Sequence, residues 1–142
     1  GFSINNDSNN YNSTQLMCTA IDLDNLVKFS GNIIQDRCIL DTLIYTEYLY
    51  RQNKVSYTVY ESIRSIYRVY KSTIGLVILP DINDVSLIAD GVRNSDIGFR
   101  NDIDTLFKQQ LESDKLKYHI VSGTNEERIE KIKQLLKQWI WI

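Results

Sequence analysis

Histidine, cysteine, proline and glycine are all scarce in this 142-residue sequence. His119 is the only histidine, and the two cysteines, Cys18 and Cys38, lack the spacing of metal ligands. A zinc site and a catalytic triad built on histidine are therefore not expected. With so few cysteines, we expect both thiols to be reduced, as they are in the cytoplasm.

Long apolar runs and a strong net charge are also missing. No run approaches the ~20 residues that span a bilayer. The first residues, Gly1 to Asn6, have neither the basic region nor the apolar core of a signal peptide. A net charge of −2 gives no overall field that would attract nucleic acid. We expect a cytoplasmic protein that binds neither membrane nor nucleic acid. The abundant asparagine and isoleucine suggest an AT-rich genome, as in a phage or a low-GC bacterium.

The length and the 43% hydrophobic content suit one globular domain over residues 1–142. The start of the chain is unusual, because residues 5–12 hold five asparagines and precede the first predicted helix. A domain rarely begins in such a loop. We therefore expect either a further segment upstream or a disordered start.

Apolar residues at helical spacing predict five helices, over about 13–29, 40–52, 56–71, 96–111 and 124–140. Thr124 and Glu127 are spaced as a capping box for the last helix. Tyrosines on the third helix favour a core or groove lining over a platform for stacking bases. The predicted buried faces are Leu16, Ala20, Leu23, Leu26 and Val27; Leu40, Leu43, Ile44, Tyr48 and Leu49; Tyr57, Tyr60, Ile63, Tyr67 and Tyr70; Phe99, Ile103, Leu106, Phe107 and Leu111; and Ile129, Ile132, Leu136 and Ile140.

Three short apolar segments, over 32–35, 75–79 and 118–121, are predicted to be strands. Pro80 ends the second strand because it has no N–H to donate to a ladder. Strands that alternate with helices indicate an α/β fold with a parallel sheet. Three strands make a thin sheet for five helices, so the sheet looks incomplete.

The pair Asp36-Arg37 is the main candidate site. It follows the predicted strand 32–35 directly, and ligands of open α/β sheets bind outside the carboxyl ends of the strands. The pair could handle a phosphate or a metal there. Alternatively, Asp36 caps the following helix and Arg37 pairs with it in solvent. Cys38, at the start of that helix, could be a reactive thiol, but we interpret it as a packing residue.

Several motifs in order resemble one group of P-loop proteins. They are Gly1-Phe2-Ser3-Ile4-Asn5, then Asp36-Arg37-Cys38-Ile39-Leu40-Asp41, then Asp90-Gly91-Val92-Arg93 with Phe99-Arg100-Asn101-Asp102-Ile103-Asp104, and finally Val121-Ser122-Gly123 with Glu126-Glu127-Arg128. The chain resembles AAA-type ATPase and kinase domains that are similar to nicotinamide riboside kinase and, more distantly, to thymidylate and deoxynucleoside kinases. The resemblance covers essentially the whole chain.

The resemblance implies an ATP-dependent phosphotransferase that acts on a nucleoside, a nucleotide or a related small metabolite, with ATP or GTP and Mg²⁺ as cofactors. Asp36 would hold Mg²⁺ or polarise the acceptor hydroxyl, and Arg37 would bind a phosphate. Arg93, in a lid over the nucleotide, and Arg100 would neutralise charge on the transferred phosphoryl group. The turn of Ser122, Gly123, Thr124 and Asn125 would lie beside the adenine.

The phosphate-binding motif of such proteins, G-x-x-x-x-G-K-[ST], does not occur in these residues. The resemblance therefore implies a three-layer P-loop kinase-like fold that lacks its first strand and P-loop helix here. We expect the C-terminal three-quarters of a kinase-like protein, which is not an autonomous enzyme without the missing segment.

Two other functions stay open. The chain could be a nucleotide-binding regulator of the same fold, which holds ATP or GTP without phosphorylating an acceptor. It could also be a non-catalytic interaction module made from a truncated kinase fold. In that case a homo-oligomer or a partner protein would cover the open edges of the sheet.

Overall fold

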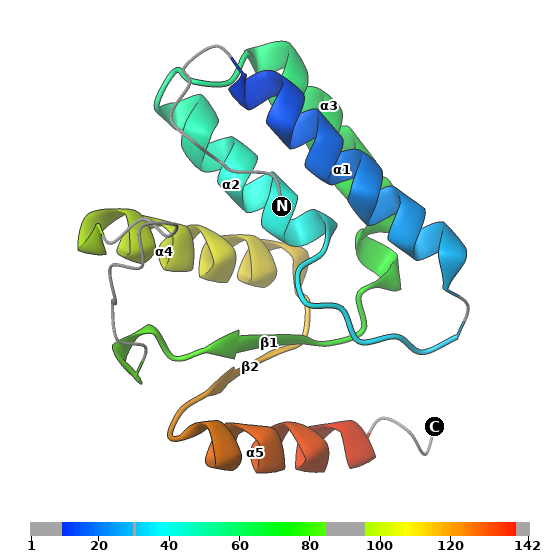
Figure 1. The fold of residues 1–142 in the computed structure, drawn as a ribbon, viewed down its shortest axis with the longest axis vertical. Coiled ribbons are helices and arrows are strands. Elements are labelled where there is room, and N and C mark those ends of the chain that lie inside the picture. The colour runs from blue at the N-terminus through cyan, green and yellow to red at the C-terminus, as the bar shows by residue number, and fades with distance from the viewer. Residues whose placement is uncertain (1–9, 30, 85–95, 139–142) are drawn as a thin grey trace. The chain divides into compact units, whose positions relative to one another are not determined.

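A computed structural model describes residues 10–29, 31–84 and 96–138. The chain divides after Thr73 into two compact units, 1–73 and 74–142, which we describe separately (Figure 1). The expectation of a single domain over 1–142 stays a prediction. No described helix is both long enough and apolar enough to cross a bilayer.

The first unit consists of three helices, α1 (Tyr11–Lys28), α2 (Ile39–Arg51) and α3 (Tyr57–Tyr70), followed by the short 3₁₀ helix η1 (Lys71–Thr73). All three pair with one another, and α2 packs most extensively against α3 (Figure 1). Ser56 caps α3 by accepting a hydrogen bond from the N–H of Val59, at 3.3 Å. All three helices lie close to their predicted bounds.

The core of the first unit is formed mainly by α2 and α3. Leu43, Ile44 and Ile63 are almost completely buried, as predicted, and Tyr67 is 1% exposed. The tyrosine-rich face of α3 is only partly internal, because Tyr57 is 62% exposed. The ring of Tyr60 stacks on that of Tyr50 with 4.8 Å between the centroids. Tyrosine therefore serves here chiefly as packing material.

The predicted buried face of α1 is wrong for Leu16, Ala20 and Val27, which are exposed, whereas Leu23 and Leu26 are half-buried. Leu16 is 45% exposed and Val27 is 83% exposed, whereas Gln15 and Thr19 are each only 3% exposed. The inner face is polar because its groups find partners there: the Thr46 hydroxyl lies 3.0 Å from Gln15 Oε1. Buried polar groups that are hydrogen-bonded carry little penalty, so α1 packs through them.

The predicted strand over 32–35 is also wrong. These residues are irregular, and Ile34 is 81% exposed. A strand requires a neighbour that takes up its backbone N–H and C=O groups. The described part of the first unit contains no other strand that could pair with them. The apolar run therefore stays irregular and joins no sheet among the described residues.

The second unit contains β1 (Val77–Pro80), the short 3₁₀ helix η2 (Ile82–Asp84), α4 (Ile97–Asp114), β2 (Tyr118–Val121) and α5 (Asn125–Lys137) (Figure 1). Among the described residues the sheet has two strands, β1 and β2, which are parallel. Val77 lies opposite Tyr118, and Pro80 lies opposite Val121. The predicted α/β organisation with a parallel sheet is thus present in this unit.

Local signals define α4 well. The carboxylate of Asp96 accepts a hydrogen bond from the N–H of Gly98 at 2.8 Å, and Lys115 ends the helix in a left-handed conformation. The predicted apolar face is confirmed for Ile103, Leu106, Phe107 and Leu111, all of which are buried.

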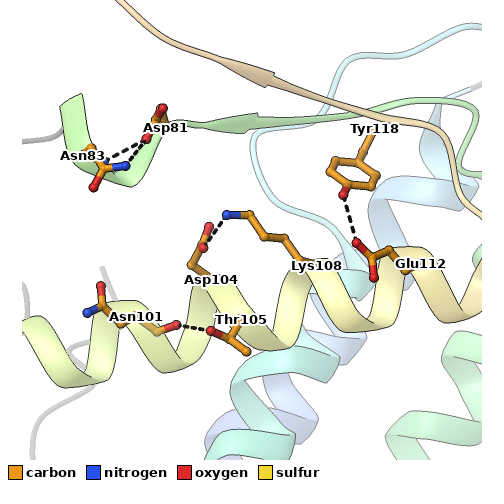
Figure 2. A network of polar contacts seen from close by, with 8 residues as sticks. All are labelled: Asp81, Asn83, Asn101, Asp104, Thr105, Lys108, Glu112 and Tyr118. Atoms are coloured by element: carbon orange, nitrogen blue, oxygen red, sulfur yellow. Dashed lines mark hydrogen bonds and ion pairs between the residues drawn. The ribbon is translucent and has the colours of Figure 1, made fainter.

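Polar side-chain contacts of this unit lie within α4, between α4 and β2, and in the turn after β1 (Figure 2). The Lys108 ammonium donates to Asp104 at 2.7 Å, and this bond raises the pKa of Lys108. The Tyr118 hydroxyl, on β2, donates to Glu112 of α4 at 3.4 Å. Asp81 accepts from the N–H of Asn83 at 2.9 Å, which shapes the turn after β1.

The last helix, α5, begins with the predicted capping box. The Glu127 N–H donates to Thr124 Oγ1 at 3.3 Å, and the Thr124 N–H donates to Glu127 Oε2 at 2.7 Å. Its predicted buried face is wrong, because no described residue of α5 is buried and Ile129 is 53% exposed. The helix packs against β2, and that contact covers its apolar side chains only in part. Ile140 lies outside the described residues.

We predict that two leucines of the first unit differ in their effect on stability. Leu43→Ala should lower the free energy of unfolding by about 2–5 kcal/mol, because it opens a cavity in a packed core. Leu16→Ala, on the exposed face of α1, should cost less than about 1 kcal/mol. Urea denaturation of both variants measures the difference. Equal losses would show that the outer face of α1 is buried in solution.

Candidate functional site

Asp36 and Arg37 lie in the irregular segment that leads into α2, and both side chains are exposed. Arg37 has a left-handed backbone with φ 75°, which is uncommon for a residue with a side chain. Its guanidinium lies over the ring of Tyr45, 6.0 Å from the centroid, at the distance of a cation–π contact. The Tyr45 ring is the described group that this exposed guanidinium contacts.

Asp36 is not the cap of α2, so the structure corrects that alternative. The N-cap residue is Cys38, whose N–H donates to the carboxylate of Asp41 at 2.9 Å. Asp41 therefore stabilises the start of the helix. Asp36 makes no hydrogen bond or ion pair within the described part of the chain, and it is left without a structural role there.

Partly buried acids surround this turn. Burial raises the pKa of Asp22, and the hydroxyl of Thr42, which donates to it at 2.7 Å, only partly offsets this rise. Burial likewise raises the pKa of Asp41, against the opposing effects of the Cys38 N–H and the Arg37 charge. The charges of Asp22 and Asp41 also repel each other. Arg37 is the cation that favours the ionised form of Asp41.

Neither cysteine is activated as a nucleophile. Burial raises the pKa of Cys38 to about 11 and also raises that of Cys18. Both thiols are thus protonated at neutral pH, and the thiolate is the reactive form. This result supports the interpretation of Cys38 as a packing residue.

A surface pocket of about 350 Å³ lies against the Asp36-Arg37 pair. It is bordered by the end of α1 and by the segment that follows α1. Its apolar part is Phe29, Ile33 and Ile34, and its polar part is Asn25, Gln35, Asp36 and Arg37. Because Phe29, Ile33 and Ile34 are all exposed, this pocket is a shallow depression of mixed apolar and polar character.

In the second unit, Ser122, Gly123, Thr124 and Asn125 form the turn between β2 and α5, and all four are exposed. The loop after β1 reaches this turn, because the Gly123 N–H donates to Asp84 Oδ2 at 2.7 Å. Arg128, on the first turn of α5, also approaches Asp84, with 4.0 Å between Nη2 and Oδ2. Asp84 thus connects the loops at the carboxyl ends of both strands.

The turn requires glycine at position 123. Its φ is +101°, and a Cβ there would clash with Glu127 Oε2. The same carboxylate oxygen accepts the hydrogen bond from Thr124 that closes the capping box. The close approach of Glu127 is therefore possible only because residue 123 has no side chain.

The structure says less about the two other arginines that were predicted to belong to the site. Arg100 lies on the first turn of α4 and is partly exposed, whereas Arg93 lies outside the described residues. Among the described residues, no group of three or more His, Cys, Asp or Glu side chains could hold a metal ion. The predicted Mg²⁺ contact of Asp36 would therefore need oxygen ligands from the nucleotide or from water.

The family model of the AAA domain matches residues 10–128, which is well over half of the chain. The chain therefore belongs to the AAA domain family, a P-loop NTPase family whose members typically bind a nucleotide together with Mg²⁺. The mixed fold with a parallel sheet is compatible with an α/β P-loop protein. No curated protein and no solved structure matches the chain.

Sequence reasoning missed two groups around these sites. Asp22 was not predicted to lie near the Asp36-Arg37 turn, since it is on the polar inner face of α1, which was expected to be outside. Asp84 is the second group, and it is not among the predicted site residues. Its place after the second predicted strand was a usable signal, because the last predicted strand is followed by the Ser122–Asn125 turn.

We predict that Asp22→Asn stabilises the protein at neutral pH. A folded-state pKa above the unfolded value means that ionised Asp22 destabilises the fold, and this cost is present above the folded pKa. The advantage of the variant should shrink as the pH falls through that pKa. Urea denaturation between pH 4 and pH 8 measures it, with the exposed Asp24→Asn as control. A destabilising effect at pH 8 would contradict the assignment.

We also predict that Gly123→Ala lowers the free energy of unfolding by about 1 kcal/mol or more, through its positive φ and the clash with Glu127. Adding Glu127→Ala should remove the closest contact, with the carboxylate, but not the backbone strain, so the double variant should lose less than the sum of the single changes. Thermal denaturation of the unmodified protein, both single variants and the double variant measures this coupling. Strict additivity would show that Glu127 does not approach residue 123.

Proposed function

We propose that this protein is an ATP-dependent phosphotransferase that acts on a nucleoside, a nucleotide or a related small metabolite. Membership of the AAA domain family supports the nucleotide-binding part of this proposal. The observation that carries the transferase part is the Asp36-Arg37 turn, where an exposed guanidinium and an uncommitted carboxylate border one pocket.

In this proposal, Arg37 binds a phosphate of the acceptor or of the transferred group. A guanidinium binds paired phosphate oxygens through its planar fork of N–H groups. The Tyr45 ring lies under the guanidinium at 6.0 Å and favours a position beside the pocket. Asp36 would polarise the acceptor hydroxyl or hold Mg²⁺ through water.

The other proposed roles follow from the family. Arg93 and Arg100 would neutralise charge that develops on the phosphoryl group, which is the main requirement for catalysing this reaction. The turn from Ser122 to Asn125 would lie beside the base of ATP or GTP. The motif G-x-x-x-x-G-K-[ST] does not occur in these 142 residues, so the proposed reaction needs phosphate-binding groups from outside them.

We predict that Arg37→Ala lowers kcat/KM for Mg·ATP-dependent phosphorylation by about 10² or more, as loss of a charge-stabilising group does in other enzymes. Arg37→Lys should restore only part of the rate, because an ammonium lacks the planar fork. Radiolabel transfer to a panel of nucleosides and nucleotides measures the product. Arg51→Ala is the control, since Arg51 pairs with Glu47 at the end of α2.

Three outcomes are informative. Unchanged rates in Arg37→Ala and Asp36→Asn would contradict the roles of these two residues. Nucleotide hydrolysis without any acceptor-dependent product would instead assign a nucleotide-binding regulator. In a separate measurement, an intact mass above that of these 142 residues would show that the protein contains additional residues, which could include a phosphate-binding segment.

A further inference from the structure

We draw no further inference here: the strongest candidate, the exposed apolar stripe of Leu16, Ala20 and Val27 along α1 in the first unit, carries none, because nothing in the described part of the chain shows what covers it.

Discussion

The parallel pairing of β1 with β2 is the constraint on which the second unit depends. Because Pro80 lies opposite Val121, the chain leaves both strands at the same edge of the sheet. The ladder continues one step further, where the Asp81 N–H donates to the Val121 carbonyl at 2.8 Å. The η2 turn then places Asp84 against Gly123. A shift of one residue in register would move Asp84 away from the turn and break this connection.

The first unit depends on a different constraint, the polar inner face of α1. Thr46 and Thr42, both on α2, hydrogen-bond to Gln15 and Asp22, so α1 is oriented by its polar side chains. This arrangement lowers the stability of the fold, because burial disfavours the ionised form of Asp22. Carboxyl groups with shifted pKa values beside a fixed cation are common at functional sites, although structural networks produce them too. Asp22 faces Thr42 and Asp41, and Arg37 is the cation that acts on Asp41.

The sequence predicted best the elements that carry their own local signals. The capping box of α5, the Asp96 cap of α4 and the apolar face from Ile103 to Leu111 are local patterns, and all are present. It failed where burial depends on a distant partner. Strand formation over 32–35 needs a neighbouring strand, and the inner face of α1 is chosen by threonines on α2. Periodicity identifies a helix but does not tell which of two faces finds a partner.

The candidate site likewise combines features that the local sequence predicts with features that only the three-dimensional structure reveals. Asp36-Arg37 was found because two charged residues follow an apolar run, even though that run is not a strand. Sequence spacing could not show that Cys38 and Asp41, rather than Asp36, satisfy the N-terminus of α2. This difference changes the role that can be assigned to the Asp36 side chain. A capping carboxylate would be committed to backbone N–H groups, whereas an exposed carboxylate beside a guanidinium and a pocket can act on a ligand.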